Sequence, residues 1–321
     1  MKTPDDLPEH ISPAQPETFS RRGFLKTVGL LPAAATVSSL GQELAAEPAP
    51  AGALPQVPFG RHTISRLVCG ANPFNAGSHL STFVNRAMRE YYTPEQVLKT
   101  LRRCQEAGIN LWQGSGNDAQ LYQRFIREGG QMQYISLASN PADIPGLAKA
   151  GCIGIAHHGE VTDQFFKAGK LDTIHEFLQR VREAGLLAGV STHMPDVVDA
   201  IESKGWELDF FMTCVYERHR SAQALEKLLG HVPLPVGEVY LQSDPPRMFK
   251  VIRQTKRTCL AFKILAAGRL SEQAFLVERA FRETFEGIKP GDAVIVGIYD
   301  RYGDQPAQNA EFVRRFGSPQ A

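Results

Sequence analysis

Thr93 to Gln113, TPEQVLKTLRRCQEAGINLWQ, is the stretch of sequence that decides the fold. Its first four residues form a capping box with proline at the first helical position, which predicts the start of a helix. Gly108 predicts the end of that helix, and the apolar run 109–113 follows directly as a strand. A helix that leads straight into an apolar strand is the repeating unit of a parallel α/β sheet.

The same alternation continues on both sides of this stretch, and it comprises eight units in all. A short hairpin over 57–64 is expected to close the bottom of the sheet. Strands are predicted over 66–70, 109–113, 133–138, 152–156, 187–191, 209–215, 258–263 and 293–297. Helices are predicted over 93–108, 119–128, 144–150, 171–184, 195–204, 222–229, 246–254, 271–288 and 305–316. The pattern predicts one (β/α)8 TIM barrel domain over residues 52–321.

Length and composition agree with a single enzyme-sized domain. The chain has 321 residues, of which 43% are hydrophobic and 21% are charged. Barrels of this kind run to about 250 residues as one domain, so the length does not require two. The formal net charge of +1 gives no basic stripe for a nucleic-acid partner.

The first 51 residues have the composition of an export signal and a linker. Ser20-Arg21-Arg22-Gly23-Phe24-Leu25-Lys26 matches the twin-arginine signature, and a mildly apolar run over 27–40 follows it. That run is too short to span a membrane, which needs about 20 apolar residues, and Ala49-Pro50-Ala51 offers a cleavage point. We therefore expect the twin-arginine translocase as a partner, export of the folded chain, and a periplasmic or other extracytoplasmic location. No later segment predicts a membrane span.

The five cysteines are expected to be thiols. Four of them, Cys69, Cys152, Cys214 and Cys259, lie in apolar strand-like runs and are predicted to be buried, while the fifth is Cys104. Their odd number and wide spacing argue against a disulfide framework, although export would permit one.

Several segments resemble the aldo/keto reductases in order and spacing. The segment VPFGRHTISRLVCG over 57–70 resembles the hairpin and first strand that open this family, and AGINLW over 107–112 resembles its second strand. Residues 185–192 resemble its fifth strand. AVIVG over 293–297, followed by Gln308-Asn309, resembles its last strand and cofactor-side helix. The resemblance implies an aldo/keto-reductase-like barrel.

The catalytic tetrad of that family (Asp, Tyr, Lys and His) is mostly absent. Gln113 stands at the Asp position, no Tyr occurs within 114–118, and the Lys position falls at Ala138 or Ser139. Only the His is matched, by His157 or His158. Without the Tyr and its partners, hydride transfer lacks its proton donor. Arg301 lies where the family grips a cofactor phosphate, so it is the one candidate for NADP binding.

Candidate catalytic residues follow from the rule that such barrels place their active sites at the C-terminal ends of the strands. Neighbouring strands lie about 4.8 Å apart, so residues after strands 4 to 7 can converge. The candidates for acid, base or nucleophile are His157, His158, His193, Glu217 and Lys263. Histidines with a carboxylate also suit Zn, Mn or Fe. The candidate metal ligands are His157, His158, His193, Glu217 and His219; the alternative is that these groups hydrogen-bond around a substrate.

Lys263 ends an apolar strand, and an inward amine there suits a base or a Schiff base. The alternative is that it pairs with a carboxylate. Arg269 is placed to hold an anionic group at a helix N-terminus. The long segment from His79 to Tyr92 is expected to form a lid or binding wall, or else to pack on the rim. The candidate substrate-binding residues are Asn72, His79, Gln113, Asn140, Tyr216 and Arg269.

Three functions are compatible with these observations. The first is an exported enzyme for a small carbonyl or sugar-like substrate, of lyase, isomerase, epimerase or hydrolase type, with a divalent metal as an option. The second is a divergent aldo/keto reductase with bound NADP, because no free nicotinamide pool exists outside the cytoplasm. The third is a non-catalytic barrel that binds a ligand.

Overall fold

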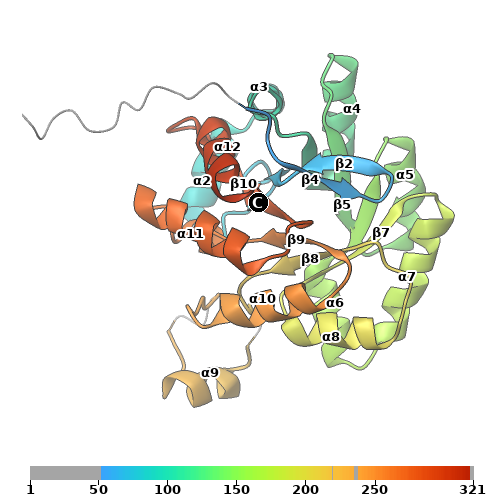
Figure 1. The fold of residues 1–321 in the computed structure, drawn as a ribbon, viewed down its shortest axis with the longest axis vertical. Helices are drawn as coiled ribbons and strands as arrows, with labels where there is room; N and C mark the ends of the chain where they lie inside the picture. The colour runs from blue at the N-terminus through green and yellow to red at the C-terminus, as the bar shows by residue number, and fades with distance from the viewer. Residues whose placement is uncertain (1–51, 219, 235–237, 319–321) are drawn as a thin grey trace, which may run out of the picture. The chain divides into compact units, whose positions relative to one another are not determined.

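A computed structural model describes residues 52–218, 220–234 and 238–318. In this part of the chain, eight parallel strands close into a barrel in the order β10-β3-β4-β5-β6-β7-β8-β9 (Figure 1). The strands are β3 (Leu67–Gly70), β4 (Leu111–Ser115), β5 (Gln133–Ala138), β6 (Gly154–His157), β7 (Leu187–Thr192), β8 (Phe210–Cys214), β9 (Thr258–Phe262) and β10 (Ala293–Gly297). The predicted (β/α)8 barrel is confirmed.

The hairpin predicted over 57–64 is also present. It comprises β1 (Gln56–Phe59) and β2 (His62–Ser65), which pair antiparallel. The ring of Phe59 packs at a tilt against that of Phe210, the first residue of β8, with the ring centres 4.9 Å apart. The hairpin therefore covers the N-terminal end of the barrel and leaves the opposite end for chemistry.

Strand residues alternate between the barrel interior and the layer beneath the helices, as the two-residue period of a strand requires. Leu111, Ile135 and Ala156 belong to the interior cluster. Their neighbours Trp112 and Tyr134 belong to the outer cluster, where their rings meet edge to face at 5.2 Å. This alternation decides which residue at a strand end faces the mouth.

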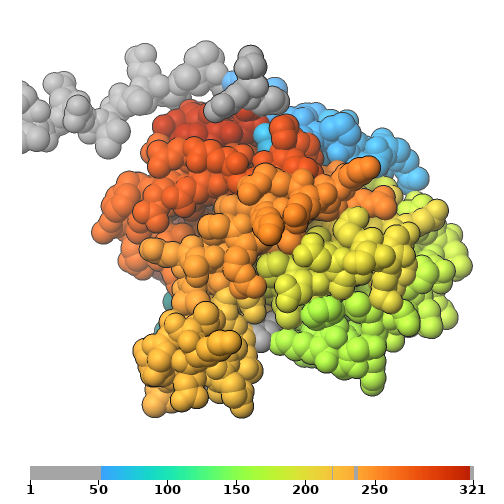
Figure 2. Space-filling view, turned by 60° about the horizontal axis from the view of Figure 1, so that its bottom comes forward, coloured from blue at the N-terminus to red at the C-terminus, as the bar shows by residue number. Residues whose placement is uncertain are grey.

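The helices surround this sheet. They are α2 (Thr82–Tyr91), α3 (Pro94–Glu106), α4 (Ala119–Arg127), α5 (Ile144–Lys149), α6 (Gly159–Lys167), α7 (Leu171–Glu183), α8 (Pro195–Ser203), α9 (Ala222–Leu229), α10 (Asp244–Gln254), α11 (Ala274–Gly287) and α12 (Gln305–Phe316). Short 3-10 helices cover Gly116–Asp118, Pro141–Asp143 and Ala266–Gly268. Helix α9 projects from the body of the barrel (Figures 1 and 2).

Two of these helices were not predicted. Helix α6 begins at Gly159, and its N-cap residue His158 makes no side-chain cap hydrogen bond, so the sequence carries no start signal for this helix. Helix α2 lies in the segment that the sequence assigned to a loop. Behind it, the hydroxyl of Tyr92 donates to the backbone oxygen of Ile298 at 2.7 Å and to Asp300 at 3.1 Å. This end of the segment therefore packs on the rim beside β10.

The second barrel strand starts two residues later than predicted. Asn110 is held by the hairpin instead, because its Oδ1 accepts from the backbone N–H of Ser65 at 2.7 Å and its Nδ2 donates to the oxygen of Thr63 at 3.2 Å. The shift places Gln113 inside β4 rather than at its end.

The five cysteines are all buried and carry free thiols, as the sequence predicted for four of them. Over the described residues, no helix combines the length and the apolar character that crossing a membrane requires.

Candidate active site

Polar side chains gather at the C-terminal ends of β6, β7, β8 and β9. They are connected by hydrogen bonds, ion pairs or close charges, and we call them the mouth cluster: His79, Glu160, Asp163, His193, Arg218, Glu238, Tyr240, Lys263 and Arg269. Active sites of (β/α)8 barrels lie at this end.

A buried aspartate holds His193 in one orientation. Nδ1 of His193 lies 2.8 Å from Oδ2 of Asp163, and its backbone N–H donates to the same carboxylate at 3.2 Å. The hydroxyl of Thr192 donates to Asp163 at 2.5 Å. A neutral ring that donates through Nδ1 carries its lone pair on Nε2, which suits a proton acceptor. Burial lowers the pKa of His193, and this effect outweighs the opposing charge of Asp163.

Gly159 allows this contact to form. A Cβ at this position would lie 2.8 Å from the hydroxyl oxygen of Ser191 and 3.2 Å from Cε1 of His193. Only glycine therefore lets the first turn of α6 approach β7 so closely. Since Asp163 lies on the second turn of α6, this approach brings its carboxylate to the end of β7.

Glu238 joins several side chains across the mouth. It contacts Nδ1 of His79 at 2.8 Å, accepts from the hydroxyl of Tyr240 at 2.5 Å, and pairs with Arg218. Arg218 also pairs with Glu160 at 2.9 Å. Burial alone would raise the pKa of Glu238, but the hydrogen bonds from His79 and Tyr240 and nearby positive charge lower it overall.

Lys263 follows β9 in a left-handed backbone conformation, with φ of 60°. Its Nζ is shielded from solvent and has no hydrogen-bond partner among the described residues. Burial lowers the pKa of Lys263, and the charges of Arg218 and Arg269 act in the same direction, while Cys214 and Glu238 oppose them. The net effect is to make the protonated form of Lys263 less stable than that of a lysine in water.

Five predicted residues lie in or beside this cluster: His79, His158, His193, Lys263 and Arg269. His158 is exposed to solvent, yet the protein around its ring disfavours the charged form and lowers its pKa. The Nη2 of Arg269 donates to the backbone oxygen of His79 at 3.0 Å, and its guanidinium lies 4.4 Å from the Tyr240 ring centre.

Two predicted catalytic residues lie elsewhere. His157 is on the opposite face of β6, where its ring meets Phe177 at 5.0 Å and its Nδ1 bonds the hydroxyl of Thr162 at 2.7 Å. Glu217 pairs with Arg220 at 3.0 Å and with Arg247 at 2.6 Å. His157 points away from the mouth because side chains alternate in direction along a strand. Glu217 lies outside the cluster because it pairs with two arginines.

Three predicted substrate-binding residues also have other roles or positions. Asn140 caps a 3-10 helix through its Oδ1, which accepts from Ala142 at 3.0 Å. Asn72 is exposed and reaches the cluster through a 3.3 Å contact with His79. Gln113 donates from its side chain to the oxygen of the adjacent Gly114 at 2.9 Å.

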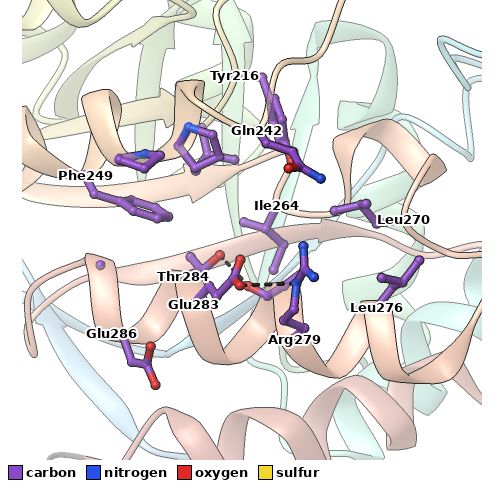
Figure 3. Close-up of a pocket in the computed structure, with 15 residues that line it drawn as sticks. Tyr216, Gln242, Phe249, Ile264, Leu270, Leu276, Arg279, Glu283, Thr284 and Glu286 are labelled. Atoms are coloured by element: carbon purple, nitrogen blue, oxygen red, sulfur yellow. Dashed lines mark hydrogen bonds and ion pairs between the residues drawn. The ribbon is translucent and has the colours of Figure 1, made fainter.

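Tyr216 lines a separate cavity of about 450 Å³ between α10 and α11 (Figure 3). Its ring also meets that of Tyr240 at 4.9 Å, so it stands between this cavity and the mouth cluster. The cavity wall carries an ion pair of Arg279 with Glu283 at 3.2 Å.

Among the described residues, the candidate metal ligands are not assembled into one site. Within the described ranges, no three His, Cys, Asp or Glu side chains are arranged to hold a metal ion. His219 lies outside the described residues. The exposed Arg301 donates to the oxygen of Ala87 at 3.3 Å and lies 5.5 Å from the centre of the Tyr302 ring. It therefore packs at the rim against α2.

Five cluster residues were missed by sequence reasoning: Glu160, Asp163, Arg218, Glu238 and Tyr240. Arg218 lies in the segment after β8, next to the predicted Glu217, so a strand-end rule that included arginine would have found it. Asp163 lies on the unpredicted helix α6. Glu238 and Tyr240 come from the segment between α9 and α10, which has no helical or strand periodicity.

The buried His157 predicts a pH-dependent stability. Burial lowers its pKa from 6.5 to about 4. A histidine with a depressed folded-state pKa contributes stability above about pH 6.5, and this stability is lost as the pH falls toward 4. The loss of stability attributable to His157 is about 3 kcal/mol.

Urea unfolding measures this loss. The free energy of unfolding should therefore differ less between pH 7 and pH 4.5 for His157→Gln than for wild type. His175→Gln, on the surface of α7, is the control; an unchanged difference in His157→Gln would contradict the assignment.

Of three comparisons with known proteins, only the one with solved structures found similar chains. No family model matches the chain, and no curated protein matches its sequence. Similar solved structures include the glycerol dehydrogenase AKR11B4 from Gluconobacter oxydans, an aldo/keto reductase (13% identity, 83% of this chain, 98% of that chain, TM-score 0.47). A truncated 3-deoxy-D-arabino-heptulosonate 7-phosphate synthase from Thermotoga maritima (11%, 82%, 91%, 0.48) and the dihydropteroate synthase of Xanthomonas albilineans (12%, 82%, 97%, 0.44) are also similar. These similarities concern the barrel alone.

Proposed function

We propose that this chain is a TIM-barrel enzyme that moves a proton on a small carbonyl or sugar-like substrate. The observation that carries this proposal is the Asp163–His193 pair at the end of β7, with Nδ1 and Oδ2 2.8 Å apart. A histidine held by a buried carboxylate is a standard arrangement for general acid–base work.

The roles in the site follow from the chemistry of each group. His193 takes the proton from the carbon next to the carbonyl, because its lowered pKa keeps the ring neutral near pH 7. Asp163 fixes the ring and stabilises the imidazolium that forms. The positive charge of Arg218 stabilises the enolate oxygen that develops when the proton leaves. Isomerisation, epimerisation and carbon–carbon lyase reactions all begin with this step.

The proposal predicts enzyme-dependent hydrogen exchange. The purified chain is incubated in D₂O with dihydroxyacetone, glyceraldehyde or pyruvate, and loss of the α-proton signal is followed by NMR. Exchange above the rate of buffer and of heat-denatured protein is expected for at least one probe. Oxidation of added NADPH without exchange would instead favour the reductase, and binding without either reaction would favour a ligand-binding barrel.

We also propose that the chain is exported folded by the twin-arginine route to an extracytoplasmic location. The support is the SRRGFLK signature over 20–26 and the apolar run that follows it. An enzyme of the proposed type needs no free nicotinamide, so its chemistry is compatible with that location.

A further inference from the structure

The amine of Lys263 lacks the hydrogen bond and the ion pair that hold the amine of Lys289. Nζ of Lys289 donates to the oxygen of Ile252 at 2.7 Å and pairs with Asp292 at 3.1 Å. Nζ of Lys263 is shielded from water and has neither kind of partner among the described residues. An unpaired ammonium is costly in such a position. The surroundings of Lys263 therefore disfavour its protonated form.

The carboxylate of Glu238, which lies near Lys263, already contacts three other side chains. Glu238 contacts the ring of His79 at 2.8 Å, the hydroxyl of Tyr240 at 2.5 Å, and the guanidinium of Arg218. Lys263 therefore has nearby charge without an ion pair, and the two arginines close to it disfavour its protonation. These are the conditions that make a lysine nucleophilic.

The backbone at this position is also unusual for a side chain of this size. Lys263, Ala266 and Ala267 have φ of 60°, 48° and 54°. Left-handed conformations at non-glycine residues cost free energy and persist where the surrounding structure imposes them, often at functional sites. Here they turn the chain sharply after β9, at the mouth of the barrel.

We propose that Lys263 forms an imine with the carbonyl carbon of the substrate. The inference rests on the proposed function, since it adds a covalent step at the same site. It narrows the substrate to an aldehyde or ketone.

The step balances without any further reactant. The lone pair of Nζ attacks the carbonyl carbon, so a C–N bond forms and the carbonyl π electrons move to oxygen. Proton transfer from nitrogen to oxygen gives a carbinolamine. Neutral His193 takes up a proton from water and passes it to the hydroxyl, which leaves as water while the C=N bond forms. The protonated imine acidifies the adjacent C–H, which neutral His193 removes.

Reductive trapping tests the proposal on the wild-type chain. The protein is incubated at pH 7 with pyruvate or dihydroxyacetone and sodium cyanoborohydride, then digested, and every lysine peptide is quantified by mass spectrometry. Burial and the charges of Arg218 and Arg269 lower the pKa of Lys263, and a lower pKa increases the fraction of reactive neutral amine at pH 7. We therefore expect the labelling of Lys263 to exceed that of exposed lysines such as Lys204 severalfold.

Two variants complete the experiment. Lys263→Arg keeps the charge and should lose the dominant label, whereas Lys289→Arg, at the other end of the barrel, should retain it. Equal labelling of Lys263 and the exposed lysines would overturn the imine, even if Lys263→Arg does not fold. Hydrogen exchange that persists without labelling of Lys263 would remove only this inference. Labelling of Lys263 without exchange would remove the proposed proton transfer instead.

Discussion

Replacing His193 with glutamine should lower the rate of hydrogen exchange by about 10²- to 10⁴-fold, the contribution expected of a positioned general base. Glutamine retains a polar side chain of similar reach, but it cannot accept and return a proton near pH 7. The measurement is α-proton exchange in D₂O with the most active of the three probes, at saturating probe concentration.

Asp163→Asn tests the Asp163–His193 pair through the pH dependence of the exchange rate. Because Asp163 raises the pKa of His193, removing its charge should move the acid limb of the pH–rate profile to lower pH as well as reduce the rate. A purely structural role of Asp163 would reduce the rate without moving that limb.

The matched control is His175→Gln, which changes the same residue type on α7, where the His175 ring stacks on Trp206 at 4.7 Å. Its exchange rate should equal that of wild type. Wild-type exchange in His193→Gln, with a native circular dichroism spectrum, would exclude His193 as the base.

Changing Arg21-Arg22 to Lys-Lys should prevent export of the chain and leave the precursor in the cytoplasm. The change preserves both positive charges, so it isolates recognition of the guanidinium pair from the general charge of the segment. Cell fractionation followed by immunoblotting measures the distribution of precursor and mature forms.

Lys2→Arg provides the charge-matched control, because it alters a basic residue outside the SRRGFLK segment. This variant should be exported like wild type. Mature protein outside the cytoplasm at the wild-type rate in the Lys-Lys variant would show that another route carries the chain.

The local sequence determined the order of the elements and the end of the barrel where the candidate site was expected. The capping box at Thr93 and the glycine at 108 each act over a few residues, and most predicted elements agree with the structure to within about two residues. Parallel strands of a barrel share one C-terminal end, and of the predicted residues after strands 4 to 7 the structure places His158, His193 and Lys263 together there, but not His157 or Glu217. Lys263 and His193 were found in this way.

Only the tertiary structure decided which side chains meet there. A strand side chain changes face at every residue, so the choice between His157 and His158 depended on where β6 sits in the barrel. Helix α6 has no start signal in its sequence, and it reaches His193 only because Gly159 lets it approach β7. Glu238 reaches the mouth from a segment without periodicity. Glu217 forms ion pairs with Arg220 and Arg247 instead of joining the cluster. These contacts join residues far apart in the chain or depend on a single side chain's direction, and neither leaves a pattern in the sequence.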